Sequence, residues 1–410
     1  MTFTARLRAP FQSFGRTVIS ASILAASLAL PQVGAAQTVV PCGGSFGSFV
    51  GNMKSHAQSR GYDKATVDRF FASAQKSDAV LRADRAQGVF KKDFIDFSRA
   101  VISQNRIDNG RHYGGKYASV FDRVEREFGV SRGVLLAFWA LETDYGQVQG
   151  NFNTLNALMT LGHDCRRPEL FQPQIVAALE LYARGDFDPA TTQGAWAGEI
   201  GMVQMLPEDI LHNGVDGDGD GHVSLKTSAP DALMSGGKML KDLGWRAGEP
   251  WLQEITVPSN LDWSKTGLDT KLTVSQWAKL GVKPRSGSLG NGNLKASVIL
   301  PMGRKGPAFL AYPNFEVYFE WNKSFVYVTT AAYFATRLEG APVYNAGNPD
   351  ASLSGAQMEQ LQRKLSARGH DVGGVDGILG RKTRAAVQAE QKRLGLPADA
   401  WPTTALLNAL

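Results

Sequence analysis

The stretch SRGVLLAFWALETDYGQVQGNFNTLNAL, residues 131–158, decides how the chain around it is expected to fold. Its helical spacing predicts a helix that ends near Glu142, because Leu135, Phe138 and Trp139 lie seven, four and three residues before that acid. An apolar setting raises the pKa of a carboxyl group, and a general acid must be neutral before it acts. The alternative is a structural acid, either solvated or paired with a basic residue.

Two glycines, Gly146 and Gly150, interrupt the predicted helix after the acid. Further along, residues 191–211 (TTQGAWAGEIGMVQMLPEDIL) contain too many glycines for an ordinary helix, which predicts close backbone contacts. Trp196 and Gln204 in this segment offer an aromatic face and an amide, the groups expected in a sugar-binding wall. The structural alternative is a tight crossing of two helices with small residues in the seam.

The loop DGDGDGHVSLKTSAPD, residues 216–231, is the clearest metal-binding pattern in the chain. It places aspartates at the first, third and fifth positions of an EF-hand loop, with a carbonyl donor at the seventh. The twelfth position is a threonine, so a later aspartate would have to close the shell. Hard oxygen ligands favour Ca²⁺ in a structural role, and the alternative is a solvated acidic turn. The predicted ligands are Asp216, Asp218, Asp220, His222 and Asp231.

The rest of the chain divides into a larger and a smaller part. Amphipathic patterns at residues 65–75, 91–101, 117–128 and 171–182 predict helices. From about residue 255 to 327, the short runs EITV, SVILP and FEVYFEW predict a small sheet. Residues 340–354 have the composition of a linker. Beyond them lies a compact unit of three helices, whose small core suits a binding appendage better than an enzyme.

The first 36 residues are predicted to be a cleaved export signal. Arg6, Arg8 and Arg16 precede the apolar run from Val18 to Leu30, which is too short to span a bilayer. No lipobox precedes Cys42, so we expect a soluble periplasmic protein without a membrane anchor. Loss of the three arginines lowers the formal net charge from +6 to +3. This mild charge suits an acidic polymer such as the cell wall and does not by itself indicate nucleic acid.

The chain contains two cysteines, Cys42 and Cys165. In an oxidising compartment we expect them to form a disulfide, and the alternative is two free thiols. The bond would tie the first residues of the mature chain to the segment that follows the acid-bearing helix. Neither cysteine has a partner at CxxC spacing, which argues against a zinc site.

Two resemblances make these patterns specific. The C-terminal runs LQRKLSARG, GGVDGILGRKTRAAVQAEQ and GLPADAWPTTALLNAL resemble the three-helix peptidoglycan-binding module of many wall enzymes. Upstream, LETDYG, GAWAGEIGMVQMLP and DGDGDGHVSL occur in the order found in the B-type lytic murein transglycosylases, which this part resembles. The resemblance implies a mainly α (α+β) fold, with a lysozyme-like helical catalytic core that holds a small β element. The implied domains are a signal peptide (1–36), a catalytic domain (37–339), a linker (340–354) and a peptidoglycan-binding domain (355–410).

The resemblance also implies roles for single residues. Glu142 falls on the family's catalytic acid, Gln204 on a sugar-contacting glutamine, and Asn322 and Tyr327 on active-site groups. The five predicted metal ligands fall on a calcium loop, with one residue inserted before the last aspartate. Glu199 stands where some members have alanine, which makes it a candidate second carboxylate. The predicted substrate-binding residues are Gln204, Asn322, Tyr327, Trp196 and Trp321.

The implied reaction cleaves the β-1,4 bond between N-acetylmuramic acid and N-acetylglucosamine and leaves 1,6-anhydromuramic acid ends. One glutamate acts first as acid and then as base, whereas a hydrolytic glycosidase needs two carboxylates. We expect peptidoglycan as the partner, a monomer, structural Ca²⁺ and no organic cofactor. Two alternatives remain open: a hydrolytic muramidase that uses Glu142 with Glu199 or Asp144, and a non-catalytic wall-binding protein.

Overall fold

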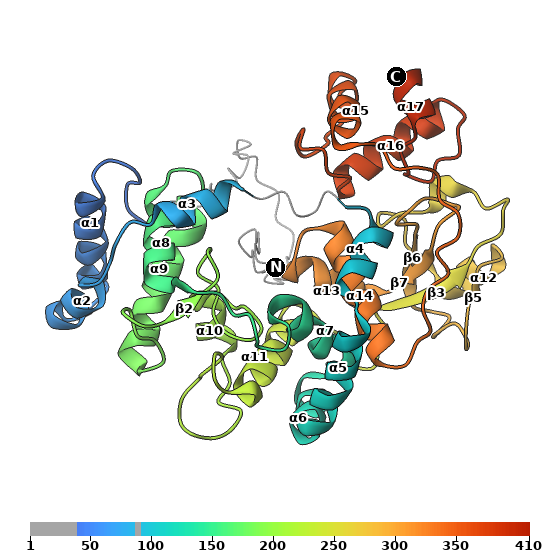
Figure 1. Cartoon of the computed structure of the whole chain (residues 1–410). Coiled ribbons are helices and arrows are strands. Elements are labelled where there is room, and N and C mark those ends of the chain that lie inside the picture. The colour runs from blue at the N-terminus through green and yellow to red at the C-terminus, as the bar shows by residue number, and fades with distance from the viewer. Residues whose placement is uncertain (1–38, 87–91) are drawn as a thin grey trace, which may run out of the picture.

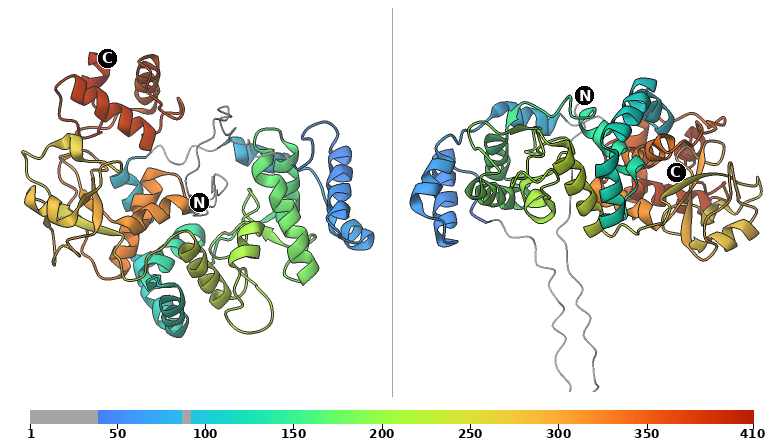
Figure 2. Two further views of the ribbon diagram at one scale, coloured as in Figure 1. Left: turned by 180° about the vertical axis from the view of Figure 1, so that it is seen from behind. Right: turned by 90° about the horizontal axis from the view of Figure 1, so that it is seen from below.

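The computed structural model describes residues 39–86 and 92–410, so the predicted signal (1–36) lies outside the described residues. Helices dominate the fold, and a small sheet lies in the second half of the chain, which confirms the predicted mainly α class. Figures 1 and 2 show the first two helices at one end of the molecule and the sheet near the other. The acid-bearing helix α7 (Arg132–Thr143) lies between these two ends.

The chain before α7 forms short helices, most of which begin at a side-chain cap. Asp63, Ser77, Asp93 and Ser103 each accept a hydrogen bond from a backbone N–H in the first turn that follows, which satisfies a donor that the helix itself leaves unpaired. The helices are α1 (Phe46–Ser59), α2 (Lys64–Phe71), α3 (Asp78–Arg85), α4 (Phe94–Val101), α5 (Gln104–Lys116) and α6 (Ala118–Phe128). The predicted helices at 65–75, 91–101 and 117–128 correspond to α2, α4 and α6.

Helix α7 is the centre of the larger core. Every residue from Gly133 to Thr143 is buried, and the helix packs against α5, α6, α11 (Ala229–Asp242) and α14 (Phe325–Leu338). A Cβ at Gly133 would lie 2.8 Å from the carbonyl oxygen of Ala335 in α14, so only glycine allows this approach. A helix that is apolar on all sides has no solvent face, which explains its place inside the molecule.

A second group of helices follows α7 and is joined to the start of the described chain by a disulfide. Cys42 and Cys165 are bonded, with their Cα atoms 5.4 Å apart. The bond joins the segment before α1 to the turn between α8 and α9, where the backbone N–H of Gly43 also donates to the carbonyl of His163. The helices of this group are α8 (Thr154–His163), α9 (Pro168–Arg184) and α10 (Pro207–Asn213).

The predicted sheet is antiparallel, with the strand order β4-β6-β7-β3-β5. Its core includes Trp277, which is fully buried and donates its indole N–H to the carbonyl of Ala296. The short helix α12 (Val274–Lys279) carries this tryptophan. The strands are β3 (Leu252–Thr256), β4 (Leu272–Thr273), β5 (Lys283–Pro284), β6 (Lys295–Ile299) and β7 (Ala308–Ala311), and a 3₁₀ turn spans Trp263–Lys265.

One predicted strand is wrong. The run FEVYFEW, residues 315–321, belongs to helix α13 (Pro313–Trp321). The alternation of apolar residues with two glutamates suggested a strand, but Phe315, Tyr318 and Phe319 also have helical spacing, and all three are buried. Pro313 occupies the first turn of the helix, where its missing N–H costs no hydrogen bond.

The C-terminal unit consists of the three predicted helices, α15 (Gly355–Ala367), α16 (Arg381–Arg393) and α17 (Thr404–Ala409). Ser354 and Gln357 form a capping box at the start of α15. The unit has a small core of its own, which includes Leu361, Leu365 and Val387. Figure 1 shows these helices (red) beside the sheet and helix α13.

Candidate active site

Glu142 lies in the last turn of α7 with 3% of its surface exposed. One carboxylate oxygen, Oε1, accepts hydrogen bonds from the indole Nε1 of Trp321 and from the hydroxyl of Tyr327, each at 2.8 Å. Phe138, one turn before the acid, stacks on Trp321 with ring centroids 4.2 Å apart. The apolar stripe predicted around this acid is therefore present, and two neutral donors from distant helices converge on the carboxyl group.

The chain turns sharply after Glu142. Asp144 and Tyr145 adopt positive φ angles of 52° and 58°, and Gly146 follows at 86°. Residues other than glycine are strained at positive φ angles, so contacts around the turn must hold its backbone in this conformation. The hydroxyl of Thr143 donates to the carbonyl of Met202 at 2.6 Å and accepts from the N–H of Gly146 at 2.9 Å. The turn is thus fixed to the glycine-rich segment.

The glycine-rich segment is not helical over residues 193–205, which rules out the helix-crossing alternative. Its first residues form β2 (Gln193–Gly194), which pairs with β1 (Phe152–Asn153). A Cβ at Gly150 would lie 2.2 Å from the carbonyl oxygen of Gly194, and one at Gly201 would lie 2.5 Å from the carbonyl oxygen of Leu225. The predicted close backbone contacts are confirmed.

Gln204 is fully buried in this segment, and its φ angle is 53°. Its Nε2 donates to the carbonyls of Gly201 (2.8 Å) and Gln149 (3.3 Å). Within the described part of the chain, the Oε1 atoms of Gln204 and Gln149 are buried without hydrogen-bond partners. Buried amide oxygens usually have a donor, so these two atoms are suited to a ligand that brings N–H or O–H groups. Trp196, predicted to contact substrate, is half-buried in the same segment.

Asn322 is positioned by the turn between α13 and α14. It ends α13, is 5% exposed, and accepts a hydrogen bond from the backbone N–H of Ser324 through Oδ1 at 2.8 Å. Ser324 in turn caps α14, the helix that carries Tyr327. One short segment therefore places Trp321, Asn322 and Tyr327, and both aromatic residues are fully buried.

The two rival carboxylates are each associated with an arginine. Asp144 forms an ion pair with Arg106, with 2.9 Å between Oδ1 and Nε. Glu199 is 1% exposed, and its charge acts on Arg167. Burial and the neighbouring Arg166 lower the pKa of Arg167, while the charges of Asp84 and Glu199 oppose that shift. Each rival acid thus has a basic residue whose charge it opposes.

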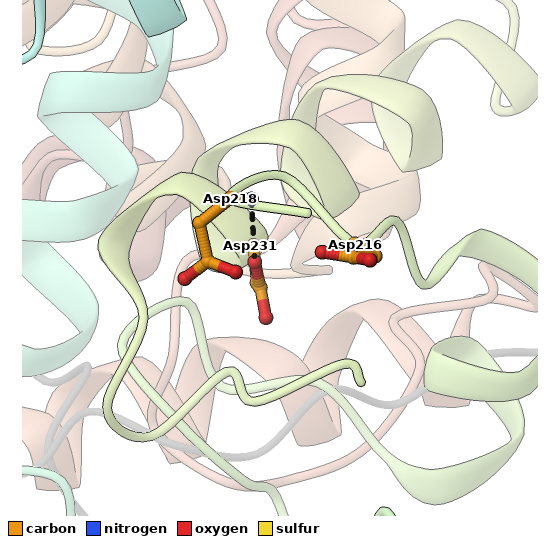
Figure 3. A group of neighbouring side chains, drawn as sticks. All are labelled: Asp216, Asp218 and Asp231. Carbon is orange, nitrogen blue, oxygen red and sulfur yellow. Dashed lines mark hydrogen bonds between the residues drawn. The ribbon is translucent and has the colours of Figure 1, made fainter. Parts of the chain in front are cut away.

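The acidic loop brings three carboxylates together. Oxygen atoms of Asp216, Asp218 and Asp231 all lie within 4.8 Å of one another, and Figure 3 shows Asp231 entering the loop from the start of α11. Asp231 is fully buried and accepts backbone N–H groups from Gly217 and Ser224. The later aspartate therefore lies with two of the other predicted ligands, and carboxylate oxygens are the ligands that calcium prefers.

The contacts of single loop residues differ in their effect on charge. Backbone N–H groups, first that of Gly221, lower the pKa of Asp216 and favour its charged form. The imidazole Nδ1 of His222 lies 3.0 Å from Oδ1 of Asp186, and this contact raises the histidine's pKa. The imidazole is therefore engaged with Asp186, and the backbone carbonyl of His222 stays a predicted metal ligand. Asp220 does not belong to the three-carboxylate group.

Comparison with known proteins identifies the family. Residues 45–336 match the family described as "Transglycosylase SLT domain". The chain belongs to this family. Residues 354–410 match a second family, described as "Putative peptidoglycan binding domain". The predicted enzyme class, a lytic transglycosylase, and the predicted type of C-terminal module are thereby confirmed.

Alignments with related transglycosylases cover most of this chain. The structure of SltB3 from Pseudomonas aeruginosa in complex with NAG-anhNAM-pentapeptide is 35% identical, covers 90% of this chain and 99% of its own, and superposes with a TM-score of 0.82. The Escherichia coli lytic transglycosylase SLT35, solved in complex with calcium, is 25% identical over 73% of this chain and 95% of its own, with a TM-score of 0.61. Membrane-bound lytic murein transglycosylase B of E. coli K12 is 26% identical and covers 64% of this chain and 75% of its own.

Sequence reasoning missed part of the transglycosylase site. It placed Trp321 and Tyr327 in the site but did not indicate that both donate hydrogen bonds to Glu142. It also missed Gln149, whose Nε2 joins the carbonyls of Gly146 and Lys226. The contacts with Glu142 and with Lys226 depend on how distant segments meet, although the position of Gln149 next to Gly150 marked a specialised turn. Among the helices of residues 39–86 and 92–410, none has the length and apolar character needed to cross a membrane.

Proposed function

We propose that this transglycosylase cleaves the β-1,4 bond between N-acetylmuramic acid and N-acetylglucosamine in peptidoglycan and leaves 1,6-anhydromuramic acid ends, with Glu142 as acid and then base. The observation that carries the proposal is the pair of donors on one oxygen of this buried carboxyl. An indole N–H can only donate, so Oε1 of the neutral acid is the acceptor and the transferable proton is carried by Oε2. The SltB3 structure with a NAG-anhNAM ligand supports this product class.

The reaction needs one carboxyl group. Neutral Glu142 gives its proton to the glycosidic oxygen, and the bond from that oxygen to C1 of the muramyl residue breaks. The acetamido oxygen of the same sugar meets the positive charge at C1. The 6-hydroxyl then attacks C1, its proton returns to Glu142, and the 1,6-anhydro ring closes without consuming water. Trp321 and Tyr327 stabilise the carboxylate that exists between the two steps.

The surrounding residues would bind the glycan. The buried Oε1 atoms of Gln204 and Gln149 are acceptors for sugar hydroxyl or acetamido N–H groups. Trp196 offers a partly exposed aromatic face to a sugar ring. Asn322 would orient the acetamido group. Holding that group beside C1 lowers the activation barrier through proximity.

The acidic loop and the two ends of the chain would serve stability, wall binding and export. We propose that Asp216, Asp218 and Asp231 hold a structural Ca²⁺ with the carbonyl of His222, which ties the loop to the start of α11. The related SLT35 structure with calcium supports this proposal. Residues 354–410 would bind peptidoglycan, and residues 1–36 would direct export to the periplasm. We expect the mature protein to act as a monomer.

Product analysis tests the reaction. Purified sacculi are digested with the full-length protein in water enriched in heavy oxygen, and the products are weighed by mass spectrometry. The proposal predicts anhydro ends, lighter than hydrolytic ends by one water and free of the label. Labelled reducing ends would show a muramidase and overturn the proposal. Bound protein without any products would show a non-catalytic wall-binding protein.

A further inference from the structure

The C-terminal module contacts the catalytic part through one face of α16. Arg381 and Arg384, one turn apart on this helix, both point toward the larger part of the chain. Arg381 pairs with Asp269, at 2.7 Å between Nη2 and Oδ1, and its guanidinium lies 6.0 Å from the ring centroid of Phe319. Gln388, a turn further along, donates to the carbonyl of Thr266 at 2.8 Å. Figure 1 shows the module (red) beside the sheet and helix α13.

Arg384 is the most enclosed of these three α16 side chains. It is 7% exposed, and its Nη2 donates to the carbonyl of Pro301 at 2.7 Å. The guanidinium lies 4.4 Å from the ring centroid of Phe325 and 5.8 Å from that of Trp401. Burial lowers the pKa of this arginine to about 9, while the charge of Asp399 opposes the shift. The arginine therefore stays charged at neutral pH, held by a carbonyl and aromatic faces.

The two aromatic rings that face these arginines flank the segment that places the donors to Glu142. Phe319 lies in the last turns of α13, two residues before Trp321. Phe325 begins α14, two residues before Tyr327. The rings of Phe319 and Phe325 are themselves 6.4 Å apart. The module thus covers the outer side of the turn whose inner side carries both donors.

We infer that the C-terminal module positions the catalytic site, with Arg384 as a positioning residue that holds the turn between α13 and α14. This role is additional to wall binding, and it rests on the proposed role of Glu142 as the acid. A module that only anchors would need no buried arginine against the turn, since a flexible linker anchors equally well. A shift of the turn would move Trp321 and Tyr327 away from the carboxyl group, and small misplacements in a catalytic site slow the chemical step.

The test separates positioning from anchoring by the choice of substrate. A short soluble murein oligosaccharide, which gains nothing from anchoring, is turned over by the full-length wild-type protein and by the variant Arg384→Met. We expect kcat for the oligosaccharide to fall about tenfold with a smaller change in KM, because the turn carries both donors and Asn322, whereas Gln204, Gln149 and Trp196 lie on other segments. We also expect the pH–rate profile to move in the same direction as in Tyr327→Phe, which removes one donor directly.

The matched control is Arg363→Met, the same substitution in α15 at a side chain that is 62% exposed. It should leave both kcat and the pH–rate profile at wild-type values. If Arg384→Met fails to fold, as judged by melting, Arg384→Lys keeps the cation beside Phe325 and should give a smaller loss. Unchanged kcat for the oligosaccharide in a folded Arg384 variant, or a lower kcat with an unmoved pH profile, would overturn the inference. Failure of the proposed function is distinct, because the wild type itself would then give no anhydro product.

Discussion

Two carboxylate sites in this protein are built in opposite ways. Glu142 is surrounded by aromatic side chains, and neutral donors of Trp321 and Tyr327 reach it from another part of the chain. Asp216 and Asp231 lie in one loop region and accept hydrogen bonds from backbone N–H groups. Neutral side-chain donors hold one oxygen of Glu142, whereas backbone donors lower the pKa of Asp216 and favour its charged form. The first arrangement suits proton transfer, and the second suits a bound cation.

The largest effect should follow from removing the acid. Glu142→Gln keeps the size and the hydrogen-bond acceptor but cannot deliver a proton, so we expect anhydro product formation from sacculi to fall by about a thousandfold. The matched control is Glu199→Gln, another buried glutamate. It should still yield anhydro ends, although its melting temperature should fall because Arg167 loses a nearby charge. Equal losses of activity in the two variants would favour a two-carboxylate enzyme.

A smaller effect should follow from removing one donor to the acid. Tyr327→Phe deletes the hydroxyl that donates to Oε1 of Glu142 and leaves the ring in place. We expect kcat to fall about tenfold, since hydrogen bonds to charged groups contribute about 1.5–3 kcal/mol. The hydroxyl favours the ionised carboxylate, so its loss should extend activity to higher pH. An unchanged pH–rate profile would show that this bond does not tune the acid.

The smallest effect on catalysis is expected at the acidic loop, where the readout is stability. For protein freed of metal by a chelator, Ca²⁺ at a hundred times its Kd should add about 2.7 kcal/mol and raise the melting temperature by about 5 °C. Asp218→Asn should abolish most of this rise, whereas Asp220→Asn, outside the three-carboxylate group, should retain most of it. A metal-free wild type that does not respond to Ca²⁺ would contradict the proposal.

The sequence predicted the parts of the site that depend on local order. The helix before Glu142, the break after it and the close contacts at Gly150 and Gly201 all follow from residue spacing and from the lack of a side chain in glycine. The need for a late aspartate followed from counting the ligands of the loop, and Asp231 lies beside Asp216 and Asp218. Each of these features is fixed by a few neighbouring residues or by simple coordination chemistry.

The sequence could not predict contacts between distant segments. Trp321 and Tyr327 lie 179 and 185 residues after Glu142, and nothing in the local pattern shows that they meet it. Helix α13 was misjudged because its apolar residues alternate with Glu316 and Glu320 as they would in a strand, although they also have helical spacing. The contact of Arg384 with Phe325 depends on how two separate units pack, which neither unit's own sequence encodes.

The bond between Cys42 and Cys165 closes a covalent ring that contains the acid-bearing helix. Its two ends are separated by 123 residues, and the segment between them contains α1 to α8. Closing a loop of this length reduces the conformational entropy of the unfolded chain, which stabilises the fold by about 4–5 kcal/mol. The acid-bearing helix lies inside this covalent ring, whereas Trp321 and Tyr327, which donate to its glutamate, lie outside it. Reduction of the bond should therefore loosen the side of the site that carries the acid and leave the covalent connection of the two donors unchanged.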